Sequence, residues 1–487
     1  MLAQRLRATA LQHGRKRCRC ETPRRALSSA AAIGQQGTAQ EVALRSRGAA
    51  LQLATLPVET RNEALAAMLA NLELRKPEIM AANELDMQDG DRLVAEGKES
   101  AALIKRLDLR GSKWDDLMGG VASLIPMADP IGAVSYATEL DDGLELYRVS
   151  CPLGVIAVIF EARPDAAVQI ASLALKSANA IILKGGSEAT RSNAALVSAM
   201  REGIASVVPV DAINVLEGRA AVADLLEMDE HVDLIIPRGS NELVQSIQNS
   251  TRIPVLGHAD GICAVYVDKS ASVQTAVDVV VDAKTQYPAV CNATETLLVD
   301  AAGAAELLPA VAAALAAKGV TLHAAPCAMA VLGDDADGVV AAADGAFKTE
   351  WLSLDVSVKL VEGVGGAVEH INAHGSGHTD AIVTEDKAAA EHFLAHVDTA
   401  NVFHNASTRF ADGFRYGFGA EVGVSTNKTH ARGPVGLEGL CIYKYKLLGR
   451  PTADGRTHTV GNFGEGDGKR KYLHRAIPSE AVNVTVE

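Results

Sequence analysis

Residues 180–187 read Ala180-Ile-Ile-Leu-Lys-Gly-Gly-Ser187, a short apolar run that ends in a lysine and two glycines. Such a run predicts a buried strand that passes through a tight turn into a helix. Similar short apolar runs occur at 154–160, 212–215, 233–236 and 264–267. Helical segments separate most of them, which is the pattern of a parallel sheet with helices on both faces. We therefore predict an α/β fold.

The rest of the chain adds further elements to this core. Strand-helix alternation resumes at 297–299, 381–383 and 401–403, which predicts a second α/β domain. Apolar residues recur at helical spacing over 43–84 and 98–117, and alternation around Asp141-Asp-Gly143 predicts a hairpin within 132–150. Beyond Arg450 the chain is polar and rich in glycine, so we expect a loop or a loosely held tail.

The composition limits the class of protein. The 487 residues are 48% hydrophobic and 22% charged, enough for two or three domains. The net charge of −14 argues against a nucleic-acid or anionic-membrane surface. The seven cysteines are scattered without a CxxC pair, which predicts a reducing compartment and no disulfide framework. No apolar run approaches the roughly 20 residues that cross a bilayer.

The first forty residues differ from the remainder. They contain seven arginines and a single acidic residue, Glu21. This composition predicts a mitochondrial or plastid presequence over residues 1–40. The alternative is a disordered basic tail on a cytoplasmic protein.

Cys291 is the candidate nucleophile. It lies in the run Tyr287-Pro-Ala-Val-Cys-Asn-Ala-Thr-Glu-Thr296, between a predicted helix at 272–285 and a predicted strand at 296–299. A thiolate on such a junction can project into a cleft, attack a carbonyl and hold the acyl group as a thioester. The alternative is a small buried apolar residue, which is what most free cysteines are.

Two strand-turn-helix junctions are candidate nucleotide sites. One contains Lys184, Gly185, Gly186 and Ser187, and the other contains Gly239 and Ser240. Free N–H groups and the dipole at a helix start favour a phosphate. Neither junction is a full GxGxxG, so an ordinary tight turn with a capping serine is the alternative for each.

The first junction also bears on the choice of cofactor. Lys184 and Ser187 place no acid directly at the strand end, although Glu188 is close. An acid there would repel a ribose phosphate, so the turn favours NADPH over NADH.

Several segments together resemble a known family. They are 152–165 (Pro-Leu-Gly-Val-Ile-Ala-Val-Ile-Phe-Glu-Ala-Arg-Pro-Asp), the Lys184-Gly-Gly turn, 283–286 (Ala-Lys-Thr-Gln), Cys291-Asn292, and the long run 418–438 that begins Phe-Gly-Ala-Glu-Val-Gly. In this order they resemble the γ-glutamyl phosphate reductases of the aldehyde dehydrogenase superfamily, over roughly residues 43–450.

The resemblance implies an architecture and a reaction. It implies a Rossmann-like NADPH-binding domain at 41–130 and 152–256, a catalytic domain at 257–430, and β-hairpin oligomerisation elements at 131–151 and 431–450, with 451–487 as a C-terminal extension. The implied reaction is NADPH-dependent reduction of γ-glutamyl phosphate to glutamate-5-semialdehyde in proline biosynthesis, by a homo-oligomer. The leader has no room for a fused glutamate kinase, so we expect a separate kinase to supply the substrate.

The resemblance also implies how the chemistry runs. Cys291 displaces phosphate and forms a thioester, hydride adds to it, and the aldehyde leaves. By position, the N–H of Cys291 and the side chain of Asn292 are the expected oxyanion donors. Hydrolytic relatives carry a glutamate base where this chain has Val255-Leu-Gly-His258, and its absence fits a reductase fed by an acyl phosphate.

Six further residues are candidate ligands. Glu350 resembles the acid that holds the nicotinamide ribose, with a solvated surface acid as the alternative. The candidate substrate ligands are Arg163, Lys284, Asn405, Ser407 and Arg409. Each has a structural alternative: an ion pair of Arg163 with Glu161 or Asp165, a solvent-facing Lys284, and a turn cap in the segment of Ser407.

The remaining alternatives concern metals and function. His370, His374 and His378 are spaced to share one helical face, but Gly375 and Gly377 interrupt the helix, so we expect no metal. Within enzymes the alternative is a CoA-acylating or hydrolytic aldehyde dehydrogenase. Outside them it is a non-catalytic NADP-binding protein on the same fold.

Overall fold

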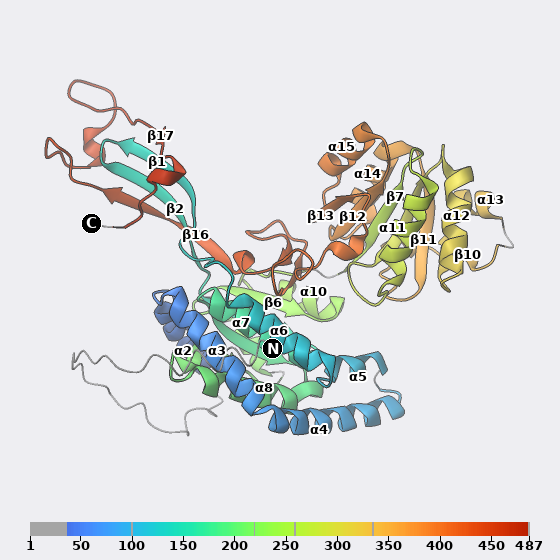
Figure 1. Cartoon of the computed structure of the whole chain (residues 1–487), viewed down its shortest axis with the longest axis horizontal. Coiled ribbons are helices and arrows are strands. Elements are labelled where there is room, and N and C mark those ends of the chain that lie inside the picture. The colour runs from blue at the N-terminus through green and yellow to red at the C-terminus, as the bar shows by residue number, and fades with distance from the viewer. Residues whose placement is uncertain (1–36, 99–100, 219, 258–259, 334–335, 486–487) are drawn as a thin grey trace. The chain divides into compact units, whose positions relative to one another are not determined.

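The computed structural model describes residues 37–98, 101–218, 220–257, 260–333 and 336–485 (Figure 1). Residues 1–36 of the predicted presequence therefore lie outside the described residues. Helix α2 begins at Ala39, where Thr38 and Glu41 form a reciprocal capping box. The folded domain thus begins slightly before the boundary expected at residue 40.

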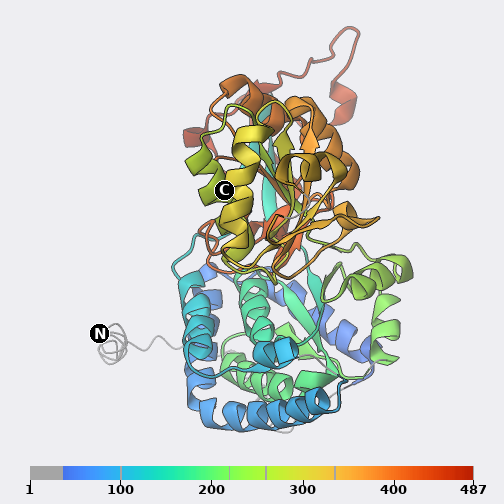
Figure 2. The same ribbon diagram turned by 90° about the vertical axis from the view of Figure 1, so that its right-hand side faces the viewer.

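The first sheet has four parallel strands in the order β5-β4-β3-β6. Alternate residues of β3 enter opposite cores: Ile156 and Val158 pack under α3, α6, α7 and α8, and Val155 and Ala157 pack under α2, α9 and α10. Helices therefore cover both faces (Figure 2). The strands are β3 (Val155–Phe160), β4 (Ala180–Gly185), β5 (Ile213–Val215) and β6 (Leu234–Arg238). The helices are α2 (Ala39–Leu53), α3 (Val58–Leu74), α4 (Lys76–Ala95), α5 (Ala101–Leu107), α6 (Ser112–Leu124), α7 (Pro164–Lys176), α8 (Thr190–Ile204), α9 (Ala220–Leu226) and α10 (Asn241–Ser250).

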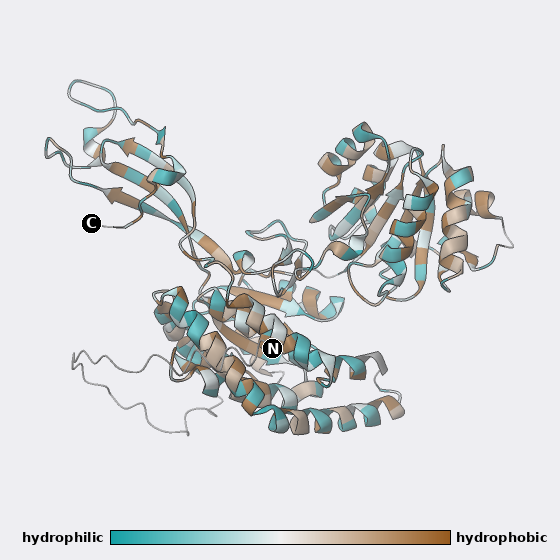
Figure 3. Ribbon diagram, in the orientation of Figure 1, coloured by the Kyte–Doolittle hydropathy of each residue, from teal (hydrophilic) through white to brown (hydrophobic). Residues whose placement is uncertain are grey.

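The second sheet has seven parallel strands in the order β10-β9-β11-β8-β7-β12-β13. Helices α11, α12 and α13 cover one face, and α14 and α15 cover the other. Its strands and helix α12 are mostly apolar, whereas α11, α14 and α15 carry both apolar and polar residues (Figure 3). The strands are β7 (Cys263–Val267), β8 (Thr294–Asp300), β9 (Thr321–Ala324), β10 (Val339–Ala341), β11 (Asp355–Val361), β12 (Thr379–Val383) and β13 (Asn401–His404). The helices are α11 (Val273–Thr285), α12 (Ala304–Ala316), α13 (Pro326–Leu332), α14 (Gly363–His374) and α15 (Lys387–His396).

The third sheet is antiparallel, in the order β16-β2-β1-β17. Strands β1 (Val134–Asp141) and β2 (Leu144–Pro152) form the expected hairpin, and Gly143 takes the positive φ of 72° in its turn. Strand β16 (Cys441–Gly449) pairs with β2 along nine residues, and β17 (Arg475–Ala476) pairs with β1. The tail after Arg450 is therefore not simply loose, because β17 and the ion pair of Arg475 with Glu139 attach it to β1. A small fourth sheet joins β14 (Gly423–Ser425) to β15 (Gly433–Val435).

Two helical expectations need correction. The stretch 43–84 is not continuous, because α2 ends at Leu53 and α3 and α4 begin at Val58 and Lys76. Pro57 favours a helix start, since proline tolerates the first turn but not the interior. The stretch 98–117 is likewise divided, because Gly111 has φ 63° directly before α6. Among the described residues, no helix combines the length and apolarity needed to cross a membrane.

Candidate functional site

Cys291 lies in the turn between α11 and β8, where its side chain is half-buried. The α11 helix begins at the cap Ser272, whose hydroxyl accepts the N–H of Thr275. The turn after α11 packs against Gly261, where a Cβ atom would lie 2.5 Å from Cα and 2.6 Å from Cβ of Cys291. Only glycine fits at this position without moving the nucleophile turn.

Hydrogen bonds fix the backbone on both sides of the thiol. The carbonyl of Cys291 accepts a weak bond from the Cys263 thiol at 3.2 Å, and the carbonyl of Asn292 accepts the hydroxyl of Thr408 at 2.7 Å. Burial raises the pKa of Cys263 well above its usual value, so Cys263 is a neutral neighbour and not a second nucleophile.

Asn292, an expected oxyanion donor, is almost fully buried. Its amide nitrogen donates one hydrogen to the carbonyl of Ala411 at 2.9 Å. The nitrogen carries two hydrogens, so one is left to meet a substrate oxygen. Its role as an oxyanion donor stays a prediction.

Arg409 and Ser407 lie beside the nucleophile turn. The Arg409 Nε donates to Gln286 Oε1 at 2.9 Å, and its carbonyl accepts a bond from Arg415. Burial and Arg415 lower the pKa of Arg409, while Asp412 and Cys291 oppose that shift. The bond to Gln286, which directly follows α11, places the guanidinium in the neighbourhood of the turn that carries the thiol. Ser407 caps the short 3-10 turn Thr408–Phe410, so its capping alternative is confirmed.

Arg238 and Glu421 also belong to this neighbourhood, and neither was expected from the sequence. A Cβ at Gly423 would lie 2.9 Å from the guanidinium carbon of Arg238, so the arginine packs directly against the backbone of this glycine. Burial and Arg163 lower the pKa of Arg238, and Glu421 and Cys291 oppose that shift. The Glu421 carboxylate accepts the N–H of Gly413 at 2.7 Å, and burial raises its pKa.

Arg163 follows β3, and Arg238 ends β6, the neighbouring strand, so the two cations lie at the same edge of the first sheet. Within the described ranges Arg163 forms no ion pair, and the Glu161 carboxylate instead accepts the N–H of Ser240. The substrate-binding role of Arg163 stays a prediction.

The placement of Lys284 requires a correction. Its side chain is fully buried, and its ammonium group lies 2.8 Å from the equally buried carboxylate of Glu295. The solvent-facing alternative is therefore wrong. The phosphate-binding role also lacks support, because the ammonium group is enclosed and already paired.

Asn405 also differs from its expected role. Its amide makes two bonds to the backbone of Thr384, at 2.9 and 3.1 Å, and the residue has the positive φ of 50°. This turn lies at the carboxyl end of β12, whereas Cys291 precedes the amino end of β8. Asn405 therefore stabilises a turn and is not placed to bind substrate.

Glu350 lies in a loop before β11 and is half-buried, which does not fit a fully solvated surface acid. The next two residues anchor the loop. Trp351 stacks on His323 with ring centroids 4.0 Å apart and donates to Ser357 at 3.1 Å, and the N–H of Leu352 bonds to Glu295 at 3.3 Å.

The two candidate nucleotide turns differ. Added Cβ atoms at Gly185 and Gly186 would meet the side chains of Asn193 and Glu188, which pack directly against this turn. Lys184 bends back to donate to the Gly185 carbonyl at 2.7 Å, and Ser187 is exposed at the start of the following 3-10 turn.

The second turn, Gly239-Ser240, meets the Glu161 carboxylate at the start of α10, where a phosphate was expected. Ser240 accepts the N–H of Leu243, so it also serves as the helix cap.

The hydrolytic base has no counterpart in the described part of this segment. Val255 occupies the matching position and bridges to Ile235 in the first sheet, and His258 lies outside the described residues. The rings of His370 and His374 are tilted against each other with centroids 4.6 Å apart, while His378 is buried beyond the helix end beside Thr379. The described residues hold no group of three or more potential ligands arranged for a metal.

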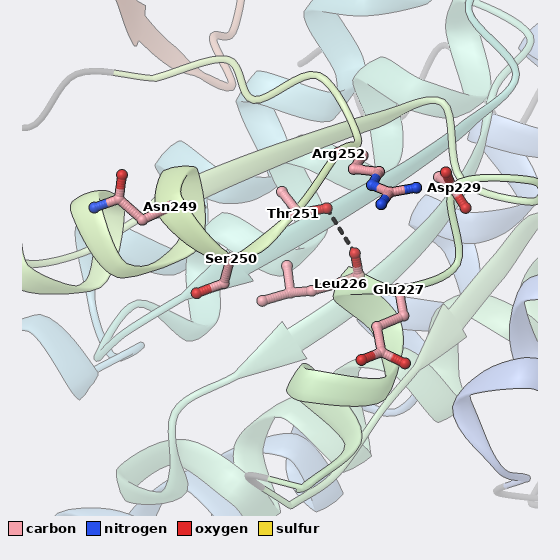
Figure 4. A pocket seen from close by; sticks show the side chains of 7 residues that line it. All are labelled: Leu226, Glu227, Asp229, Asn249, Ser250, Thr251 and Arg252. Atoms are coloured by element: carbon pink, nitrogen blue, oxygen red, sulfur yellow. Dashed lines mark hydrogen bonds between the residues drawn. The ribbon is translucent and has the colours of Figure 1, made fainter.

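A hollow of about 500 Å³ lies elsewhere, at the carboxyl end of α10 (Figure 4). Thr251 in its wall donates to the carbonyl of Leu226 at 2.6 Å. Its lining residues are Leu226, Glu227, Asp229, Asn249, Ser250, Thr251 and Arg252. Because Gly239-Ser240 precedes the other end of α10, this hollow is not the candidate nucleotide turn.

Comparison with known proteins identifies the family. Residues 16–326 match the aldehyde dehydrogenase family model. The chain is 47% identical over 430 residues to the probable gamma-glutamyl phosphate reductase of Schizosaccharomyces pombe, covering 87% of this chain and 94% of the relative. It is 52% identical to the gamma-glutamyl phosphate reductase of a Cyanothece strain, covering 84% and 93%. The crystal structure of the Thermotoga maritima gamma-glutamyl phosphate reductase superposes with a TM-score of 0.81 at 37% identity, covering 86% of this chain and 100% of that one. The expected resemblance and fold class are confirmed, and the chain belongs to the γ-glutamyl phosphate reductases within the aldehyde dehydrogenase family.

Proposed function

We propose that this chain reduces γ-glutamyl phosphate to glutamate-5-semialdehyde and phosphate, with NADPH as the reductant, as a step of proline biosynthesis. The observation that supports the proposal is the half-buried thiol of Cys291, on a turn that Gly261 fits closely and to which the Arg409 guanidinium is bonded through Gln286. Membership of the family supplies the substrate class.

The thiolate begins the reaction. Nearby cations stabilise an ionised sulfur, and the substrate itself brings a phosphate and a carboxylate that need positive partners. The sulfur attacks the γ-carbonyl carbon, the C–O bond to phosphate breaks, and phosphate leaves with the bonding electrons. Arg238 and Arg409 are the residues of this neighbourhood that can bind the two anionic groups of the substrate.

The second half of the reaction is reduction. NADPH, when bound, supplies a hydride to the thioester carbon. The resulting oxyanion is expected to meet the N–H of Cys291 and the free amide hydrogen of Asn292. When the C–S bond breaks, the aldehyde leaves and the thiolate is restored. Val255 provides no carboxylate to activate water, so the thioester is not hydrolysed and persists until hydride is transferred to it.

The cofactor preference rests on the turn after β4. The turn is a candidate dinucleotide site because two glycines join strand β4 to the next helical segment, and the Asn193 and Glu188 side chains beside these glycines would have to move for a cofactor to approach the backbone. Lys184 adds a positive charge. The Glu188 carboxylate accepts the N–H of Ala162 and is therefore already bonded within the protein. These features support NADPH over NADH. At the second turn, Glu161 covers the start of α10 and would have to move for a phosphate to bind there.

We also propose that the protein forms a homo-oligomer through its third sheet. Strand β16 is an edge strand of nine residues, and Tyr443, Tyr445 and Leu447 are exposed on it. A long edge strand with exposed apolar side chains favours pairing with another chain. Light scattering after size-exclusion chromatography measures the assembly, and a strictly monomeric protein contradicts the proposal.

The destination of the protein is a separate proposal. The composition of residues 1–40 supports import into mitochondria or plastids. A fluorescent protein fused behind residues 1–40 should enter an organelle, and a diffuse cytoplasmic signal would support the alternative.

The reverse reaction tests the function directly. With pyrroline carboxylate, NADP and phosphate, the wild type should form NADPH, and the rate should depend on phosphate. Cys291→Ala should abolish that rate, whereas Cys327→Ala, which removes an exposed thiol on α13, should leave it unchanged. Activity that requires CoA in place of phosphate would support the acylating alternative, and a phosphate-independent rate would support the hydrolytic one.

A further inference from the structure

Two fully buried charged residues bracket the nucleophile turn. Lys284 lies in the last turn of α11, Glu295 is the second residue of β8, and Cys291 lies between them. Their side chains are 0% exposed, and the Nζ–Oε2 distance is 2.8 Å. The ion pair therefore joins the two ends of the loop that carries the thiol.

The second carboxylate oxygen of Glu295 reaches a different segment. Its Oε1 accepts the N–H of Leu352 at 3.3 Å. Leu352 has the positive φ of 54°, which is uncommon for a residue with a branched side chain and requires support from its surroundings. Glu350, two residues earlier, is the candidate ribose ligand. One carboxylate thus joins the nucleophile turn to the loop of Glu350.

Stability alone does not explain this arrangement. Burial raises the pKa of Glu295 to about 7 and also lowers the pKa of Lys284, so each charge is costly to bury. A buried ion pair is often no more stabilising than apolar residues of the same volume. Glu295, however, accepts the hydrogen bond from the N–H of Leu352, which an apolar residue could not do. That bond holds Leu352, a residue with positive φ, in a neighbouring loop.

We propose that Glu295, held by Lys284, is a positioning residue that sets the Glu350 loop against the Cys291 turn, so that nicotinamide and thiol are held in register. The inference rests on the proposed function and assigns Lys284 to the support of the site. Loss of the Leu352 bond should weaken NADPH binding while the fold is retained.

Two double variants separate the bond from the charge. Lys284→Met with Glu295→Gln keeps the shape and a carbonyl oxygen for Leu352, whereas Lys284→Met with Glu295→Leu removes that acceptor. We expect the Gln form to bind NADPH close to wild type and the Leu form to bind about tenfold more weakly, since one hydrogen bond of this kind is lost. NADPH fluorescence titration measures this without any turnover.

Asp268→Asn is the matched control. Asp268 is also buried and hydrogen-bonded, but it follows the far end of β7, about 16 Å along the strand from Cys263 at 3.3 Å per residue. Its variant should lose stability and keep the wild-type NADPH affinity. The same comparison rules out a general effect of destabilising the domain.

The outcomes are distinct. Equal NADPH affinity in the Gln and Leu forms overturns the inference. If the Leu form does not fold, Glu295→Asp decides, because the shorter carboxylate keeps the charge but cannot span Lys284 and Leu352; wild-type affinity in that variant also overturns the inference. A wild type that binds NADPH but shows no phosphate-dependent activity refutes the proposed function and leaves the result on Glu295 standing.

Discussion

Gly261→Ala should slow the chemistry without removing any reacting group. The added Cβ would lie 2.5 Å from Cα of Cys291, and ordinary carbon contacts begin near 3.5 Å, so the two segments must separate by about 1 Å. The Gly261 side has little freedom, because the N–H of Ile262 bonds to Ser376 at 2.9 Å and Cys263 begins β7. The nucleophile turn therefore takes most of the shift.

A displacement of this size has a predictable cost. Misplacing a nucleophile by about 1 Å lowers kcat on the order of 100-fold, or roughly 2.7 kcal/mol in the activation barrier. Overpacking should also cost about 1–3 kcal/mol of folding stability. NADPH affinity should change much less than kcat, because the atoms nearest the added Cβ belong to Cys291 and not to the cofactor turns of the first sheet or to the Glu350 loop.

The assay combines three measurements: kcat in the phosphate-dependent reverse reaction, NADPH affinity by fluorescence, and Tm. Gly257→Ala is the matched control, since its Cβ would meet Pro237 at an ordinary 3.4 Å. If Gly261→Ala folds and keeps kcat within about twofold of wild type, the thiol is not positioned by this contact and the reasoning fails.

Three further predictions follow from single side chains. Arg238→Lys loses the planar fork and should lower kcat/KM for γ-glutamyl phosphate about tenfold with unchanged NADPH affinity; an unchanged kcat/KM removes Arg238 from the site. Lys184→Ala should raise KM for NADPH about tenfold and leave KM for NADH unaltered, whereas equal effects on both argue against a 2′-phosphate contact. Burial raises the pKa of Asp380 from 3.8 to about 7, so the folded state holds this proton more tightly than the unfolded chain. Stability to urea should therefore fall, by up to about 4 kcal/mol, as pH rises from about 4 to about 7, and Asp380→Asn should remove that slope.

The strands that the sequence predicts well are those with continuous apolar runs. All six residues of β3 are buried between helix layers, and burial on both faces produces such a run. Strands β9, β10 and β11 were not predicted. β9 and β10 have only four and three residues, whereas β11 carries alternating valines at Val356 and Val358, a pattern that indicates a strand.

Candidate residues that one short motif supplies could be named from the sequence, and residues that only the fold brings together mostly could not. Cys291 and Asn292 are adjacent in the chain, whereas Arg409 was named because it follows a strand end, and the fold brings it to the turn of Cys291. Arg238 and Glu421 come from separate elements, and only the pairing of β3 with β6 brings Arg238 to the edge that Arg163 occupies.

The burial of Lys284 was predictable in principle. It falls four residues after Val280 and eight after Ala276, on the buried stripe of α11. A lysine on an apolar stripe at helical spacing indicates a buried partner, because an isolated charge is too costly to bury. The sequence does not show which acid is the partner, since Glu295 belongs to the next strand.

Asn405 shows how a sound general rule was applied to the wrong edge. Ligands of parallel α/β sheets usually bind at the carboxyl ends of the strands, and in the first sheet the candidate ligands Lys184 and Arg238 lie at those ends. In the second sheet the candidate groups lie on loops that enter strands: Cys291 before β8 and Glu350 before β11. The carboxyl ends of that sheet instead carry a closed polar network in which Asn405 bonds to Thr384 and Thr384 bonds to Asp268. A hydrogen-bond donor that is already bonded inside this network cannot bind a substrate. Substitutions in the network should therefore lower Tm and leave kcat and KM unchanged.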